Sequence, residues 1–153
     1  MRRKTIAKFH NLNSIIILIV VFGLDQIVKY FFKILMSVNQ SIPLIPNFFH
    51  LTLVLNQGAG FGILQGQRIF FIVITIIVIG FLIYKWKTIP QEKNISIPLG
   101  LILGGLFGNF MDRLIGGYVV DFIDFRIWPV FNIADSCISI GVIWLVIYIW
   151  RKK

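Results

Sequence analysis

The sequence has little charge and almost no cysteine or histidine. Only 14% of its 153 residues are charged, whereas 58% are hydrophobic, and the mean hydropathy is +0.87. A water-soluble domain of this size carries more charge and less apolar surface, so the composition indicates an integral membrane protein. The few polar residues inside its apolar segments are therefore the informative ones.

These scarcities disfavour several classes of site. The single cysteine, Cys137, can form no intramolecular disulfide and has no companion for a metal site. The two histidines, His10 and His50, form no His-x-x-x-His pair, which argues against a zinc peptidase. Ser136 has neither a Gly-x-Ser-x-Gly context nor a histidine spaced to serve it, so a serine triad is also disfavoured. A serine–lysine pair would require Lys29 to reach Ser136.

Four stretches are long and apolar enough to cross a bilayer, because about 20 helical residues span roughly 30 Å of hydrocarbon. Basic residues precede the first stretch, as in a cleavable signal peptide, but its length and internal charges predict a retained helix. No internal repeat is visible, which gives an inverted-repeat transporter little support. We expect a single membrane domain over residues 1–153, with spans at about 14–35, 69–86, 97–115 and 131–150.

The distribution of basic residues predicts the orientation in the membrane. Most of the fifteen Lys and Arg residues lie in three patches, in the N-terminal arm, the loop at 85–93 and the C-terminal tail: Arg2, Arg3, Lys4, Lys8; Lys85, Lys87, Lys93; Arg151, Lys152, Lys153. Cytoplasmic segments of membrane proteins are enriched in Lys and Arg, so both termini and the 85–93 loop are predicted to be cytoplasmic. Segments 36–68 and 116–130 then face outward. This distribution, despite the net charge of +9, argues against a nucleic-acid partner.

The first outward segment predicts a small β-structure. Apolar and β-branched residues flank an Asn-Gln-Gly-Ala-Gly turn, so we expect strands at about 50–56 and 60–65 within a β segment at about 42–66. Pro43 and Pro46 indicate an extended lead-in. The expected fold class is an all-α integral membrane protein with four transmembrane helices, a small extracytoplasmic β-hairpin or half-sheet, and cytoplasmic termini.

Charged residues in the first span are spaced to form a pair. Asp25 and Lys29 lie at i and i+4 with the acid first, the favourable order on one helix face. An unpaired charge at mid-bilayer costs about 2.5–3.5 kcal/mol on insertion scales. We therefore expect a structural ion pair that holds helices together.

The outer end of the third span presents a polar face. Asn109, Asp112 and Arg113 follow at i, i+3 and i+4, beyond a small-residue face in GGLFG at 104–108 that lets another backbone approach. Asp112 is expected to neutralise a neighbouring cation. Arg113 is a candidate for contacts with substrate carbonyls, because a guanidinium presents several fixed donors.

More carboxylates follow at the same depth. Asp121 and Asp124, three residues apart, point to opposite faces of an extended strand, so one can face inward while the other meets water or Arg126. Asn132 and Asp135 share a face at the start of the fourth helix, where they would also suit an N-cap and a first-turn acid. Two carboxylates facing each other across a low-dielectric cleft tend to share a proton, which is the chemistry of aspartic peptidases.

The ordered motifs resemble those of signal peptidase II, the bacterial lipoprotein signal peptidase family. The likeness runs from about residue 15 to 150 and preserves motif order as well as content. The motifs are DQIVK at 25–29, NQGAGFG at 56–62, GNFMDR at 108–113, VVDFIDF at 119–125 and FNIADS at 131–136.

This resemblance implies an intramembrane aspartic peptidase of the bacterial cytoplasmic (inner) membrane, with its active site towards the extracytoplasmic side. It implies cleavage of prolipoproteins N-terminal to a diacylglyceryl-modified cysteine, without metal or cofactor, by a protein we expect to be monomeric among membrane lipids. The implied catalytic pair is Asp121 and Asp135. The implied substrate-binding residues are Asn56, Gly58, Asn109, Arg113 and Asn132, and the implied structural polar residues are Asp25, Lys29 and Asp112.

Two other classes of function stay open from the sequence. A small proton- or ion-coupled transporter would use the intramembrane Asp, Lys and Arg residues as a relay, but a relay predicts polar residues through the whole bilayer, whereas these crowd the outer half. A non-catalytic lipid-binding or assembly protein would survive loss of either candidate aspartate. The outer hairpin at 50–65, with glycines at 58, 60 and 62, is a candidate lid over the cleft.

Overall fold

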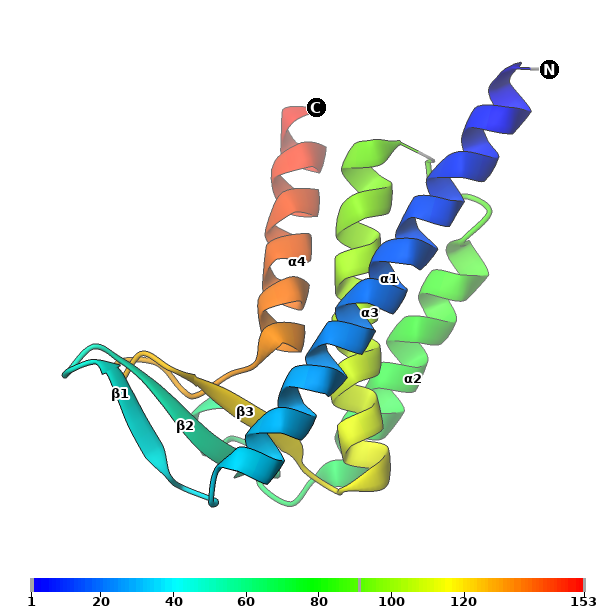
Figure 1. The fold of residues 1–153 in the computed structure, drawn as a ribbon. Helices are drawn as coiled ribbons and strands as arrows, with labels where there is room; N and C mark the ends of the chain where they lie inside the picture. Colours follow the sequence, from blue (N-terminus) through cyan, green and yellow to red (C-terminus); the bar gives the residue numbers. More distant parts are fainter. Residues whose placement is uncertain (1, 91, 153) are drawn as a thin grey trace.

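Four helices and one small sheet make up the protein, and both termini lie at the end of the bundle opposite the sheet (Figure 1). The computed structural model describes residues 2–90 and 92–152, with side chains from residue 12 onward. The basic side chains of the N-terminal patch and Lys153 lie outside the described residues. The elements are α1 (Arg2–Leu35), β1 (Ser41–Ile45), β2 (Phe49–Asn56), the 3₁₀ turn η1 (Gly60–Gly62), α2 (Arg68–Lys85), α3 (Lys93–Ile115), β3 (Val119–Asp124) and α4 (Ile133–Arg151).

The four predicted spans are confirmed, with small shifts at their ends. Apolar side chains such as Ile19, Ile76 and Ile143 are not covered by other parts of the protein. They lie on the outer faces of the helices, as expected for surfaces that face lipid. α4 begins two residues later than expected, after the cap residue Asn132. Within the described residues, the helical segments long and apolar enough to cross a membrane are Leu12–Leu35, Arg68–Lys85, Lys93–Ile115 and Ile133–Arg151.

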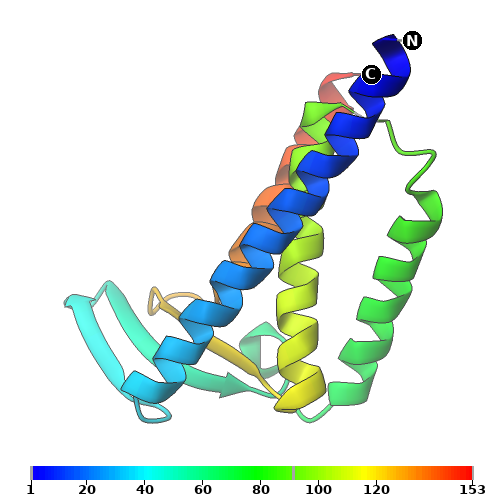
Figure 2. The same ribbon diagram turned by 45° about the vertical axis from the view of Figure 1, so that its right-hand side comes forward.

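α3 is the centre of the bundle, with α1 and α4 packed along it and α2 set further away (Figure 2). Its glycines permit this closeness. A Cβ atom at Gly100 would lie 2.8 Å from the Ser14 carbonyl oxygen, and one at Gly105 would overlap the Ala134 carbonyl. The buried Ser14 hydroxyl donates a hydrogen bond of 2.7 Å to the Ser96 carbonyl. The small-residue face predicted for the third span is therefore the surface on which α1 and α4 pack.

The sheet is antiparallel, in the order β1-β2-β3, with β2 in the middle. Leu53 of β2 and Val120 of β3 bury their side chains with Met36, which follows α1. Asp121 lies opposite Val54 across the β2–β3 pair. The sheet thus fixes one candidate aspartate at the end of the helix bundle.

The expected strand at 60–65 is wrong. This segment folds on itself, with Phe61 in the left-handed region at φ 60° and the Ala59 amide donating to the Ile63 carbonyl at 2.8 Å. Closely spaced glycines favour such tight turns over extension. β2 pairs instead with β1, whose Pro43 is tolerated because β1 is an edge strand, and with β3 from the second outward segment.

The same strand pairing shortens the segment that could move as a lid. Residues 50–56 are held in the sheet, paired with β3 from His50 to Asn56 and with β1 as far as Thr52, which leaves the loop at 57–66. Gly58 is buried, its amide donates to the Asn56 side-chain oxygen at 2.9 Å, and a Cβ there would lie 2.6 Å from the Ile63 carbonyl oxygen. Gly58 is a fixed point of this loop, and closure by the remainder stays a prediction.

The glycine face of α3 makes a testable prediction. Gly105→Ala places a methyl group against the Ala134 backbone and is expected to destabilise the protein by about 1–3 kcal/mol. Gly80→Ala is the matched control, because no atom lies within 4 Å of a Cβ there, and alanine favours the helix by roughly 0.5–1 kcal/mol. Thermal unfolding in detergent measures both variants. Equal changes in melting temperature would contradict this packing.

Candidate active site

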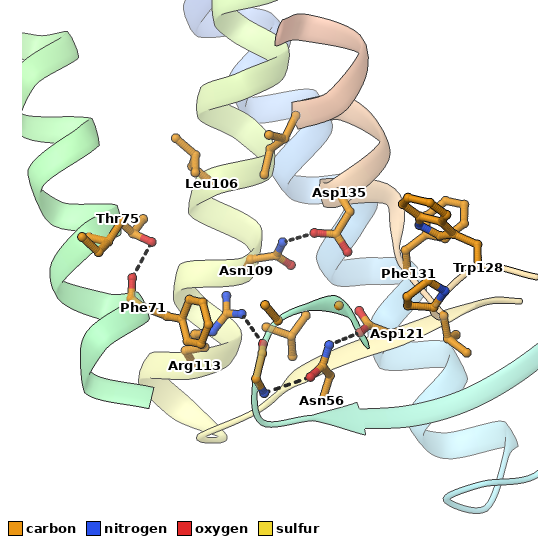
Figure 3. Close-up of a pocket in the computed structure, with 18 residues that line it drawn as sticks. Asn56, Phe71, Thr75, Leu106, Asn109, Arg113, Asp121, Trp128, Phe131 and Asp135 are labelled. Atoms are coloured by element: carbon orange, nitrogen blue, oxygen red, sulfur yellow. Dashed lines mark hydrogen bonds between the residues drawn. The ribbon is translucent and has the colours of Figure 1, made fainter. Parts of the chain in front are cut away.

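A pocket of about 370 Å³ lies where the sheet meets the helix bundle (Figure 3). Residues from β2 and the loop after it, α2, α3, β3, the loop before α4 and α4 line it, so segments far apart in the sequence meet here. Asp121 and Asp135 both face this pocket. Three of the polar residues expected around them, Asn56, Asn109 and Arg113, line it as well.

Asp121 is buried in β3 and held by two asparagine amides. Its side chain is 1% exposed, and its oxygens accept hydrogen bonds of 2.7 Å from Asn132 Nδ2 and 2.9 Å from Asn56 Nδ2. The Asn56 oxygen accepts from the Gly58 amide, which turns the Asn56 amino group towards the carboxylate. Burial and the negative charge of Asp135 together raise the pKa of Asp121 to about 7.

Asp135 occupies the first turn of α4. Its Oδ1 accepts a hydrogen bond of 2.7 Å from Asn109 Nδ2, and its Oδ2 accepts from the Asn132 backbone amide at 3.3 Å. The Asn132 side chain in turn accepts from the Asp135 amide at 2.9 Å, which completes a capping box. The predicted N-cap and first-turn acid are thus confirmed, and the cap fixes the Asp135 carboxylate beside the pocket.

Asn132 links the surroundings of the two carboxylates. It is fully buried, and its Nδ2 donates to Asp121 and also lies 3.1 Å from the Asn109 oxygen. Asn109 donates its own Nδ2 to Asp135. Amides from α3 and from the start of α4 therefore form one network that contacts both acids.

A buried ionic cluster lies behind this network. Lys29 Nζ is 2.7 Å from Asp25 and 2.8 Å from Asp112, and it donates to the Asn109 oxygen at 3.0 Å. The ion pair predicted within the first span is confirmed, as is the neutralising contact predicted for Asp112. Gln26, which donates to Asp112 at 3.0 Å, was missed, because its partner is 86 residues away and the sequence carries no local signal for the contact.

Arg113 lines the pocket but also holds the loop above it. Its Nη2 donates to the Gly58 carbonyl at 3.1 Å, and its guanidinium carbon lies 4.5 Å from the centroid of the Phe71 ring (Figure 3). The structure therefore gives this guanidinium a protein carbonyl and an aromatic ring in addition to the substrate contact expected from the sequence. Phe71 comes from α2, and only the tertiary fold reveals it.

Two neighbouring polar residues do not join this arrangement. Asp124 is not among the residues that line the pocket, and its carboxylate accepts hydrogen bonds from the Thr52 hydroxyl at 2.6 Å and the Arg126 amide at 2.8 Å. Burial opposes its ionisation, but these bonds and the Arg126 charge prevail and lower the pKa of Asp124. Ser136 donates to the Asn132 carbonyl at 2.9 Å, and the lysine it would need as a base lies in the ionic cluster.

Comparison with known proteins decides the family. The family model of signal peptidase (SPase) II matches residues 17–151. The chain belongs to the signal peptidase II family. The lipoprotein signal peptidase of Halothermothrix orenii is 52% identical over 139 residues, which cover 90% of this chain and 95% of that protein. The lipoprotein signal peptidase of Caldanaerobacter subterraneus subsp. tengcongensis is 51% identical over 132 residues, 85% of this chain and 90% of that protein.

Solved structures share the fold. A bacterial membrane enzyme determined by the in meso method at 2.3 Å resolution superposes with a TM-score of 0.84 at 40% identity, over 90% of this chain and 87% of that chain. A second, determined at 1.9 Å resolution, gives a TM-score of 0.82 at 39% identity, over 92% of this chain and 94% of that chain. As a member of the signal peptidase II family, the chain is a multi-pass membrane protein and a peptidase.

The raised pKa of Asp121 predicts a pH-dependent effect of Asp121→Asn on stability. The pKa of the Asp121 carboxyl is about 7 in the folded state and 3.8 at its ordinary value, so the folded protein binds this proton more tightly. The resulting contribution to stability is complete below pH 3.8 and is lost as pH rises to 7. Each unit of difference corresponds to about 1.4 kcal/mol. Asparagine does not titrate, so the variant does not lose this stability as pH rises. The difference in melting temperature, variant minus parent, should therefore increase between pH 4.5 and pH 8.

Asp124→Asn is the matched control on the same strand. The lowered pKa of Asp124 stabilises the folded state above its ordinary pKa, and that contribution is lost as pH falls. Its variant should therefore lose more stability at pH 8 than at low pH, the opposite trend. A pH-independent difference between Asp121→Asn and the parent would contradict the site described above.

Proposed function

We propose that this protein is a lipoprotein signal peptidase of the bacterial cytoplasmic membrane, an aspartic endopeptidase with Asp121 and Asp135 as its catalytic pair. It cleaves prolipoproteins on the N-terminal side of the diacylglyceryl-modified cysteine. The observation that carries the proposal is that two carboxylates, buried Asp121 and partly buried Asp135, line one pocket and that each is held there by asparagine amides. The names of its relatives support the substrate.

The proposed reaction needs one ionised and one protonated carboxyl group. Ionised Asp135 takes a proton from a water molecule whose oxygen attacks the scissile carbonyl carbon, while protonated Asp121 donates to the carbonyl oxygen. When the tetrahedral intermediate collapses, the C–N bond breaks and the leaving nitrogen takes the proton held by Asp135. Asp121 recovers its proton from the re-forming carbonyl, and both carboxyls return to their starting states.

The environment of Asp121 supports its role as the proton carrier. Its pKa of about 7 leaves about half of it protonated at neutral pH and nearly all of it protonated at lower pH. Asp135 accepts from the Asn109 amide and from the N-terminal end of α4, where the helix dipole favours negative charge. These surroundings support the proposed division of roles, in which Asp121 holds the proton and Asp135 is ionised.

The walls of the pocket suit a membrane-resident substrate. α2 contributes Phe71 and Ile74, α3 contributes Leu106 and α4 contributes Ile138. These apolar side chains can pack against a signal-peptide helix and acyl chains that enter from the lipid. The pocket lies at the end of the bundle opposite both termini, so cytoplasmic termini would place cleavage on the extracytoplasmic side. A single copy of the chain supplies all these residues, and we propose that a monomer is active.

The decisive experiment is cleavage of a diacylglyceryl-modified prolipoprotein by purified protein in detergent, followed by gel shift. The parent should cut before the lipidated cysteine. Asp121→Asn and Asp135→Asn should each lower kcat by on the order of 10²–10⁴-fold, because either change removes a proton-transfer group. Asp124→Asn, which alters the same strand outside the pocket, should cut at nearly the parental rate.

The comparison is made only with variants whose thermal unfolding in detergent shows a folded state. A folded parent that leaves the lipidated substrate intact contradicts the proposed function. A folded Asp121→Asn or Asp135→Asn variant that cuts at the parental rate contradicts the proposed pair and favours a binding role.

The pH dependence of cleavage is a second prediction. Activity requires a proton on Asp121, so kcat/KM should fall as pH rises above about 7, tenfold per unit once the proton is lost. Initial rates between pH 5 and 9 measure it, and a profile that stays flat to pH 9 would contradict the assignment of the proton carrier.

A further inference from the structure

The described environment of Lys29 uses every donor that its ammonium group has. The side chain is 2% exposed, and Nζ contacts Asp25 at 2.7 Å, Asp112 at 2.8 Å and the Asn109 oxygen at 3.0 Å. An ammonium group carries three N–H donors and no acceptor. Two of them therefore form the ion pairs, and the third binds an amide that belongs to the candidate active site.

This third contact fixes which way the Asn109 amide points. Because Lys29 can only donate, the Asn109 oxygen must face it, and Asn132 Nδ2 also points to that oxygen, at 3.1 Å. The Asn109 amino group is then left to donate to Asp135 at 2.7 Å. A flipped amide would place N–H groups against the ammonium and an oxygen against the carboxylate, and both contacts would be repulsive.

The charge of Lys29 also acts on the carboxylates of the site. Two carboxylates, Asp25 and Asp112, surround the single ammonium of Lys29 in the described cluster, so Lys29 is the only positive charge in it. A positive Lys29 favours an ionised carboxylate among its neighbours, and its charge is one of the influences that oppose the rise in the pKa of Asp121. The charged and amide groups around Lys29 are Asp25 and Gln26 on α1, Asn109, Asp112 and Arg113 on α3, Asp121 on β3, and Asn132 and Asp135 on α4.

We propose that Lys29 is a positioning residue for peptide cleavage: it locks the Asn109 amide so that Asp135 is the ionised member of the pair and Asp121 carries the proton. This inference rests on the proposed function. It gives Lys29 a role in catalysis in addition to a structural role in holding α1 against α3. Lys29 touches neither substrate nor water in this scheme and acts through Asn109. It should therefore affect kcat and its pH dependence more than KM.

The test compares two variants that differ only at Lys29. Asp25→Asn keeps the lysine bonded to Asn109 and Asp112, and the asparagine oxygen can still accept from the Ala134 amide that Asp25 binds at 2.9 Å. Asp25→Asn/Lys29→Gln removes the ammonium as well, so that one acid and one base are neutralised together. Ser14→Ala, which breaks a buried α1–α3 hydrogen bond away from the carboxylates, is the control for packing alone.

The readouts are kcat, KM and the pH profile of kcat/KM with the lipidated prolipoprotein. Relative to Asp25→Asn, the double variant should lose about tenfold or more in kcat, with KM changed less than about twofold, because Lys29 orients the groups around the reacting acids and does not contact the substrate. The acid limb of its profile should move to higher pH by about one unit, since a nearby positive charge is gone. Ser14→Ala should lower the melting temperature and keep the parental profile.

A folded double variant whose kcat and pH profile match those of Asp25→Asn overturns the inference and leaves Lys29 as a structural clip. If the double variant does not fold, Lys29→Met is judged by the same criteria, because its apolar chain fills the space of the lysine stem. Failure of the parent to cleave would instead refute the proposed function, so the two failures are distinguishable.

Discussion

The rest of this structure depends on one constraint: two carboxylates share a pocket at the end of a transmembrane helix bundle, and ionising both of them there is costly. A buried negative charge beside another is expensive, and a directly paired cation would hold both acids ionised. Here the donors are neutral amides: Asn56 and Asn132 for Asp121, and Asn109 for Asp135. Amides stabilise a carboxylate while leaving it able to take up a proton, which is what shared-proton chemistry requires.

The helix packing and the sheet each help to hold this arrangement in place. The glycine face of α3 lets α1 and α4 approach closely, which brings both Lys29 and the α4 capping box into contact with Asn109. The sheet closes the end of the bundle and fixes Asp121 in a strand rather than in a mobile loop. Cations remain near the site, but they bind partners other than the two carboxylates: Lys29 in its cluster and Arg113 on the Gly58 carbonyl.

Local spacing predicted much of this from the sequence. Long apolar runs revealed the helices, the i and i+4 pattern revealed Asp25 and Lys29, and the strand alternation separated Asp121 from Asp124. Helix-start chemistry identified the Asn132 cap. These features could be predicted because each one depends on residues that are close together along the chain.

Features that depend on distant parts of the chain were not predictable. The pairing of β2 with β1 and β3 replaced an expected hairpin, because the glycines after Asn56 form a turn. The contacts of Gln26 with α3 and of Phe71 with Arg113 exist only once the helices have packed. Gly58 appeared in a turn motif, whereas its burial and its role as the acceptor for Arg113 needed the structure.

The central claim is that the two acids share one proton at neutral pH, with Asp121 carrying it. Carbon-13 NMR of the side-chain carboxyls in the folded protein, assigned by comparison with Asp121→Asn and Asp135→Asn, measures this directly. The account predicts that Asp121 titrates near pH 7 while Asp124 titrates below its usual range, and that Asp135→Asn moves the Asp121 titration to lower pH. An Asp121 carboxyl that is fully ionised at pH 5 would contradict the account.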